Sequence, residues 1–62
     1  MREKFTLKKG KQLKFFLKDL YQGSFWDYEN DVEVDFNKEC SNMVITRDTM
    51  YLSYPCDRYE VA

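Results

Sequence analysis

Five acidic residues stand at every second position of one segment, and this spacing is the strongest chemical signal in the sequence. In an extended chain, alternate side chains leave the same face, so neighbouring carboxylates would lie about 6.7 Å apart. A ladder of negative charge with that spacing predicts a surface that mimics the phosphates of a nucleic acid. We call this set the acidic row: Asp27, Glu29, Asp31, Glu33 and Asp35.

The acidic row also has interpretations other than phosphate mimicry. A calcium-binding EF-hand loop needs Gly at its sixth position and Glu at its twelfth. Counted from Asp27, those positions hold Val32 and Lys38, which excludes the loop. The alternatives are a solvated strand face, partly neutralised across the sheet by Lys38, Arg47 or Arg58, weak binding of divalent ions, and self-association with the basic helix.

A second charged set lies nearer the N-terminus and is basic: Lys8, Lys9, Lys11, Lys14 and Lys18. These lysines could contact phosphate, a membrane surface or an acidic patch, or they could simply keep the protein soluble. Recognition of base edges is poorly supported, because Gln12 is the only amide side chain in residues 11–21. The net charge of −1 also opposes non-specific binding of nucleic acid.

The residue types that most enzymes need are scarce. The chain has no His, so the commonest general base and metal ligand is absent. Its two glycines stand apart and form no phosphate-binding loop. Two cysteines without His cannot make an ordinary zinc site. We therefore expect no enzyme activity, no cofactor and no metal; Cys40 and Cys56 are either reduced thiols or a disulfide.

Aromatic residues flank Asp27, the first residue of the acidic row. Trp26 and Tyr28 either close a small core together with Phe25, or stay exposed and anchor a partner beside the carboxylates.

The elements that must position these residues follow from the spacing of apolar side chains. A helix over about 11–21 is predicted, because apolar residues recur there at intervals of three and four. Gly23 would end it. The residues that form the apolar face of this helix are Leu13, Phe16, Leu17, Leu20 and Tyr21.

Strands are predicted after the helix, where the apolar period becomes two. They cover 32–36, 43–46, 50–54 and a last edge at 58–61, while 5–7 forms a short strand or an extended arm. A tight turn at Arg47-Asp48 would place Ile45 opposite Met50, and it would bring Cys40 near Cys56.

The expected fold class is therefore α+β: one N-terminal amphipathic helix packed on a three- to four-stranded antiparallel sheet. With 62 residues, the chain is expected to form a single small domain over 1–62. No signal peptide or membrane span is recognisable, which favours a cytoplasmic protein.

The charge is divided between two parts of the chain. Residues 1–20 hold seven basic and two acidic residues, and residues 21–62 hold three basic and nine acidic ones. The leading hypothesis is a non-catalytic binding protein, monomer or homodimer. It would inhibit a nucleic-acid-handling partner by placing the acidic row in that partner's basic groove. Small acidic inhibitors from phages and mobile elements, including anti-CRISPR and anti-restriction proteins, are similar in this general sense only. The alternatives are a nucleic-acid-binding accessory protein that uses the lysines, and a structural or assembly module.

Overall fold

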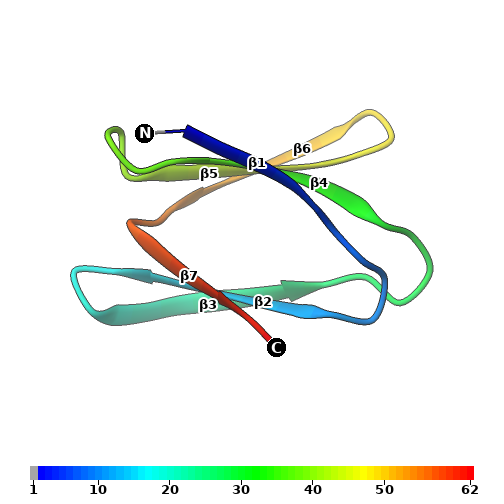
Figure 1. Ribbon diagram of the computed structural model, residues 1–62, viewed down its shortest axis with the longest axis horizontal. Coiled ribbons are helices and arrows are strands. Elements are labelled where there is room, and N and C mark those ends of the chain that lie inside the picture. Colours follow the sequence, from blue (N-terminus) through cyan, green and yellow to red (C-terminus); the bar gives the residue numbers. More distant parts are fainter. Residues whose placement is uncertain (1) are drawn as a thin grey trace.

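The computed structural model describes residues 2–62, which form seven antiparallel strands and no helix. Figure 1 shows the strands in two stacked sheets. The strands are β1 (Arg2–Leu7), β2 (Gln12–Leu17), β3 (Leu20–Trp26), β4 (Val32–Asn37), β5 (Asn42–Arg47), β6 (Met50–Pro55) and β7 (Arg58–Val61).

The larger sheet has the order β1-β4-β5-β6 and the smaller one the order β3-β2-β7. β4, β5 and β6 form a meander, whereas β1 pairs with β4 from far away in the sequence, with Leu7 opposite Val32. After β6 the chain crosses from the larger sheet to the smaller one, where β7 pairs with β2. The fold is all-β, and the α+β prediction is wrong.

The predicted helix over 11–21 is instead the hairpin of β2 and β3. Leu13 and Phe15 are both buried, which is the period of a strand, although the same apolar run also fits a helix. The hairpin reverses at Lys18 and Asp19, whose φ angles of 51° and 64° are those of a type I′ turn. Residues 13–21 contain too few polar interruptions for their spacing alone to separate the two periods.

Gly23 lies inside β3 and does not end a helix. The register of β2 against β3 shifts between Phe15 and Phe16, so the hairpin contains a β-bulge. Gly23 has a φ of +152°, and a Cβ atom there would lie 3.4 Å from the Phe15 ring. The position therefore favours glycine for its backbone angle, whereas the space beside Phe15 would admit a Cβ atom in ordinary contact.

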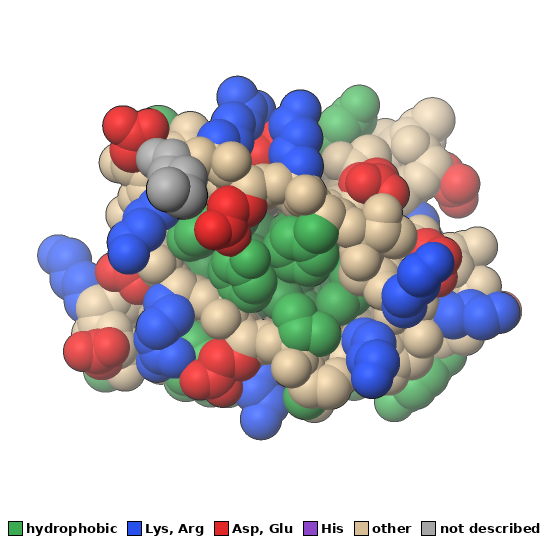
Figure 2. All heavy atoms as spheres, in the orientation of Figure 1, with side chains coloured by type: hydrophobic (Ala, Val, Ile, Leu, Met, Phe, Trp, Pro, Cys, Tyr) green, Lys and Arg blue, Asp and Glu red, His purple; other side chains and the backbone are tan. Residues whose placement is uncertain are grey.

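The core lies between the two sheets, where alternate residues of the strands face inward. Tyr59 of β7 joins the layers at one side: its ring stacks on Phe5 at 5.3 Å and meets Phe36 edge-on at 5.0 Å. Figure 2 shows hydrophobic side chains in the middle of the face that β1 and β7 cross, ringed by side chains of both charges. The buried apolar residues are Leu7, Leu13, Phe15, Val32, Val34, Phe36, Met43, Ile45 and Cys56.

The strands predicted over 5–7, 32–36, 43–46, 50–54 and 58–61 are confirmed, but the predicted hairpin register is wrong by two residues. Arg47 pairs with Met50 around a two-residue loop, so Ile45 faces Leu52 and not Met50. A shift of two residues keeps the same side chains on the inner face. Cys40 is exposed and Cys56 is buried, and both are free thiols. In residues 2–62 no helix has the length and hydropathy needed to cross a membrane.

Candidate functional site

The acidic row does not form one ladder, because its first residue turns inward. Asp27 follows β3 and is only 8% exposed. Its carboxylate accepts hydrogen bonds from the Arg47 guanidinium at 2.6 Å and from the backbone N–H groups of Glu29 and Asn30. These bonds, the one from Arg47 foremost, lower the pKa of Asp27 to about 2. Asp27 organises a loop and is not available to a partner.

Asp31 and Asp35 are paired with the N-terminal basic residues. Arg2 donates two hydrogen bonds to Asp35, at 3.0 and 2.8 Å. Asp31 accepts the backbone N–H of Lys9 at 2.9 Å and lies 3.4 Å from the Lys8 ammonium group. The pKa of Asp35 is lowered mainly by the bond from Arg2, and that of Asp31 mainly by the Lys9 N–H.

Glu33 is exposed on β4 and accepts a hydrogen bond from the Thr6 hydroxyl at 2.8 Å. Glu29 is exposed in the loop that Asp27 holds. Only Glu33 and Asp35 lie on a strand. The pairing of β1 with β4 thus brings Arg2 and Lys8 close to Asp35 and Asp31, and these ion pairs compensate part of the acidic row within the molecule.

The five lysines lie around the smaller sheet. Lys8, Lys9 and Lys11 occupy the connection between β1 and β2, Lys14 is in the middle of β2, and Lys18 is in the β2–β3 turn. Among the ion pairs of residues 2–62, only Lys8 of this set has a carboxylate partner. The other four lysines remain available to an anionic ligand.

The outward face of the smaller sheet combines aromatic and basic side chains. Because Leu13 and Phe15 point into the core, the residues of β2 next to them point to solvent. Their partners on β3 and β7 point the same way: Gln12 faces Trp26, Lys14 faces Ser24 and Glu60, and Phe16 faces Tyr21 and Arg58. We call this surface the aromatic–basic face: Gln12, Lys14, Phe16, Tyr21, Ser24, Trp26, Arg58 and Glu60.

One end of the aromatic–basic face is built from stacked groups. The Arg58 guanidinium lies 4.0 Å from the centre of the Phe16 ring. Phe16 and Tyr21 meet edge to face at 5.8 Å, and the Tyr21 hydroxyl is hydrogen-bonded to Ser24. Arg58 also pairs with Glu60 at 2.8 Å. These contacts hold the rings in place while Tyr21 stays 59% exposed.

The other end carries the only tryptophan of the chain. Trp26 is 48% exposed and Tyr28 is 73% exposed. Both line a shallow hollow with Gly10 and Gln12, next to the lysine-rich β1–β2 connection. The Gly10 N–H donates to the Asp27 carbonyl at 2.7 Å, which fixes this connection against the end of β3. Trp26 and Tyr28, which flank Asp27 in the chain, thus lie at the end of the sheet where the β1–β2 connection meets β3.

Sequence reasoning missed Phe16, Tyr21 and Arg58 as site residues. The predicted helix places Phe16 and Tyr21 on its apolar face, whereas in the hairpin they pair with each other on the outward face of the sheet. A signal was present in the alternation of Gln12, Lys14 and Phe16 with Leu13 and Phe15, which a strand would turn to opposite faces.

Comparison with known proteins adds no relative: no protein family, curated protein or solved structure matches the chain. Within residues 2–62, no group of three or more Cys, Asp or Glu side chains is placed to hold a metal ion. The candidate site therefore rests on the geometry of the aromatic–basic face.

Proposed function

We propose that this protein is a non-catalytic module that binds single-stranded nucleic acid on the aromatic–basic face. The observation that supports this most directly is the exposure of Trp26 and Tyr21 at the two ends of one sheet face, with Lys14 between them. Flat sheets with aromatic side chains stack two or three bases in known RNA-binding modules. Any base can stack on an aromatic side chain, so this mode of binding needs no helix with amide side chains to recognise base edges.

The arrangement of charge favours this proposal over the inhibitor that displays the acidic row. Asp27, Asp31 and Asp35 each have a basic partner within the protein, and a phosphate mimic needs its carboxylates free for the other molecule. The net charge of −1 still opposes long-range attraction. Binding therefore depends on local contacts, in which bases meet aromatic rings and phosphates meet lysines.

The affinity should depend moderately on salt. The four lysines without a carboxylate partner set an upper limit of four neutralised phosphates. For single strands, the slope of log K against log salt is about −0.7 per phosphate, so a slope no steeper than about −3 is expected.

The test is titration with a short oligothymidine and a short oligouridine, each carrying a fluorescent label for anisotropy. Intrinsic fluorescence is a second readout, because Trp26 is the only tryptophan and lies in the site. We expect Trp26→Ala to weaken binding by roughly 5- to 150-fold, which corresponds to about 1–3 kcal/mol for one stacked base. Lys14→Glu should also weaken it.

Matched controls exist on the larger sheet. Tyr51→Ala removes an aromatic side chain that is 72% exposed on β6, and Lys38→Glu reverses an exposed lysine between β4 and β5. Neither should change the affinity. The proposal is wrong if the oligonucleotides do not bind at low salt, or if Trp26→Ala and Tyr51→Ala bind equally well.

The same titration distinguishes nucleic-acid binding from the hypothesis that the acidic row inhibits a protein partner. That hypothesis predicts no oligonucleotide binding, and it predicts loss of a protein partner when the acidic row is reversed. Reversal should be made at Glu29 and Glu33, because Lys at position 35 would face Arg2 and disturb the sheet itself.

A further inference from the structure

A free strand edge on the larger sheet has unusual properties. Each sheet ends in two edge strands, and a free edge presents unpaired backbone groups that attract another strand. Proteins usually guard such edges with charged residues, bulges or proline. Of the four edges here, β1 carries Arg2, Glu3 and Lys4, and β7 carries Arg58 and Glu60.

The other two edges have no charged residue, and only one of them is regular. β3 is interrupted by the bulge beside Gly23, which protects its edge. β6 (Met50–Pro55) pairs with β5 without any shift of register. The open edge of β6 is therefore regular and uncharged, and Pro55 is its one residue that disfavours pairing with another strand.

The hydrogen-bond pattern shows which groups of β6 are free. In a hairpin with a two-residue loop, the pair next to the loop is hydrogen-bonded, and bonded pairs then alternate with non-bonded ones. That first pair is Arg47 with Met50, so Met50, Leu52 and Tyr54 bond to β5. Tyr51 and Ser53 turn their N–H and C=O groups to the open edge. Pro55 is tolerated because its missing N–H would also point to that edge.

We infer that β6 is a self-association edge on which a second copy of this protein docks by antiparallel strand pairing. A two-fold axis at Leu52 places Tyr51 of each copy opposite Ser53 of the other, so four backbone hydrogen bonds form. This register keeps inward side chains inward in both copies. A register centred on Ser53 would set Tyr51 against Pro55, which has no N–H to donate.

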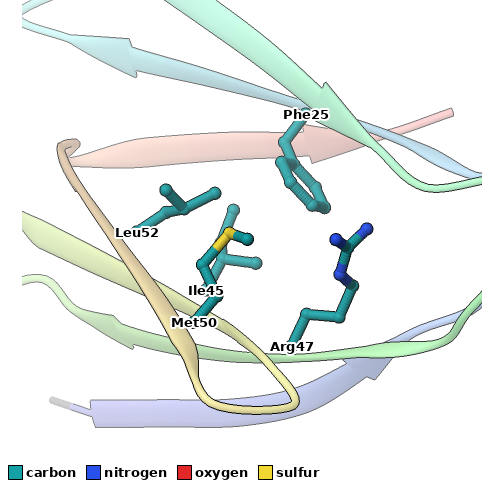
Figure 3. A pocket seen from close by; sticks show the side chains of 5 residues that line it. All are labelled: Phe25, Ile45, Arg47, Met50 and Leu52. Atoms are coloured by element: carbon teal, nitrogen blue, oxygen red, sulfur yellow. The ribbon is translucent and has the colours of Figure 1, made fainter.

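Two features favour a second copy as the occupant. The edge is its own complement under that two-fold axis, and the absence of charge on β6 means that no like charges meet. An apolar hollow of about 70 Å³ also lies beside this edge, lined by Phe25, Ile45, Arg47, Met50 and Leu52. Figure 3 shows Phe25 of β3 pointing across the gap towards the side chains of β5 and β6. The inward residues of a second β6 would cover this hollow.

The test is sedimentation of the full chain over a wide concentration range, from about 10 µM to 1 mM, which brackets weak association. The wild type should form dimers whose fraction rises with concentration. Ser53→Pro removes an edge N–H without removing a bond to β5, and Tyr51→Lys adds charge to the edge. Both variants should weaken dimerisation at least tenfold. Thr46→Lys adds the same charge opposite Tyr51, on the inner strand β5, and should dimerise like the wild type.

Circular dichroism confirms that each variant is folded, and Tyr51→Lys alone suffices if the proline variant does not fold. A monomer at every concentration overturns the proposal. A dimer that Tyr51→Lys leaves intact overturns it as well, because another surface must then hold the copies together. This interface lies apart from the aromatic–basic face, so its failure leaves the proposed function unaffected.

Discussion

At the β2–β3 turn, a hairpin and a helix predict stability changes of opposite sign for the same substitution. Lys18 and Asp19 both have positive φ, and L-residues reach that region at a cost. We consider the double substitution Lys18→Asn, Asp19→Gly, which installs the preferred type I′ sequence. It removes one positive and one negative charge, so the net charge is unchanged. The hydrogen bond from the backbone N–H of residue 18 to Asp57 is also kept.

The size of the effect follows from two opposing terms. The left-handed conformation costs about 1–2 kcal/mol for each ordinary residue, and Asn reduces this cost while Gly removes it. Glycine in the unfolded chain has more conformational freedom, which offsets about 0.5–1 kcal/mol. The net gain should be about 1 kcal/mol, which raises the melting temperature of a domain of this size by about 4–8 °C.

Thermal unfolding followed by circular dichroism measures the effect. In a helix over 11–21, Asn and Gly would both lower the helix propensity, and the melting temperature would fall. The control is Thr49→Gly in the other hairpin turn, where φ is not positive and glycine brings only its entropic cost. A variant that melts below the wild type would refute the hairpin, and so would an equal effect of Asp19→Gly and Thr49→Gly.

Three further predictions concern single positions. Gly23→Ala should destabilise the protein by about 1–3 kcal/mol, because alanine is strained at this φ, and urea unfolding would measure it. The pKa of Asp27 falls from 3.8 to about 2 on folding, so the unfolded state binds more protons between these values. Stability should therefore decrease as the pH drops from about 4 to 2, and less so in Asp27→Asn, as urea midpoints would show; an unchanged slope would contradict the role of Asp27. Cys40 should react with a thiol reagent in the folded protein and Cys56 only after unfolding, since burial also raises the pKa of the Cys56 thiol. Equal rates would contradict the burial of Cys56.

The strands of the C-terminal two thirds were predictable, and the first hairpin was not. Val32, Val34 and Phe36 alternate with acidic residues, so only a strand buries all three. Between 13 and 21 the apolar residues are dense enough to satisfy both periods, and Lys18-Asp19 is not a common I′ turn sequence. The spacing of the apolar residues alone does not distinguish a helix from a strand there. β2 also pairs with β7, whose residues lie more than 40 positions away along the chain, and local spacing carries no sign of that pairing.

Only part of the candidate site was predictable. Lys14 and Trp26 were recognised from the sequence, whereas Phe16, Tyr21 and Arg58 of the same sheet face were not. The acidic row and the lysines were both recognised from the sequence, yet the ion pairs that Arg2 and Lys8 make with the row depend on the pairing of β1 with β4, which no local pattern reveals. Trp26 and Tyr28 were expected beside carboxylates. Both flank Asp27, whose side chain is committed to Arg47 and to the loop backbone, and both line the hollow beside Gly10.

The position of β7 has a consequence for synthesis on the ribosome. Tyr59 contacts Phe5 of β1 and Phe36 of β4, and its hydroxyl donates to Glu3 at 2.6 Å, so residues 58–61 join both layers. At about 5–20 residues per second, a chain that has exposed β1 through β6 still lacks this junction. Until the final strand emerges, Phe5 and Phe36 lack their contacts with Tyr59, and a message cut short before β7 would leave a product without this junction.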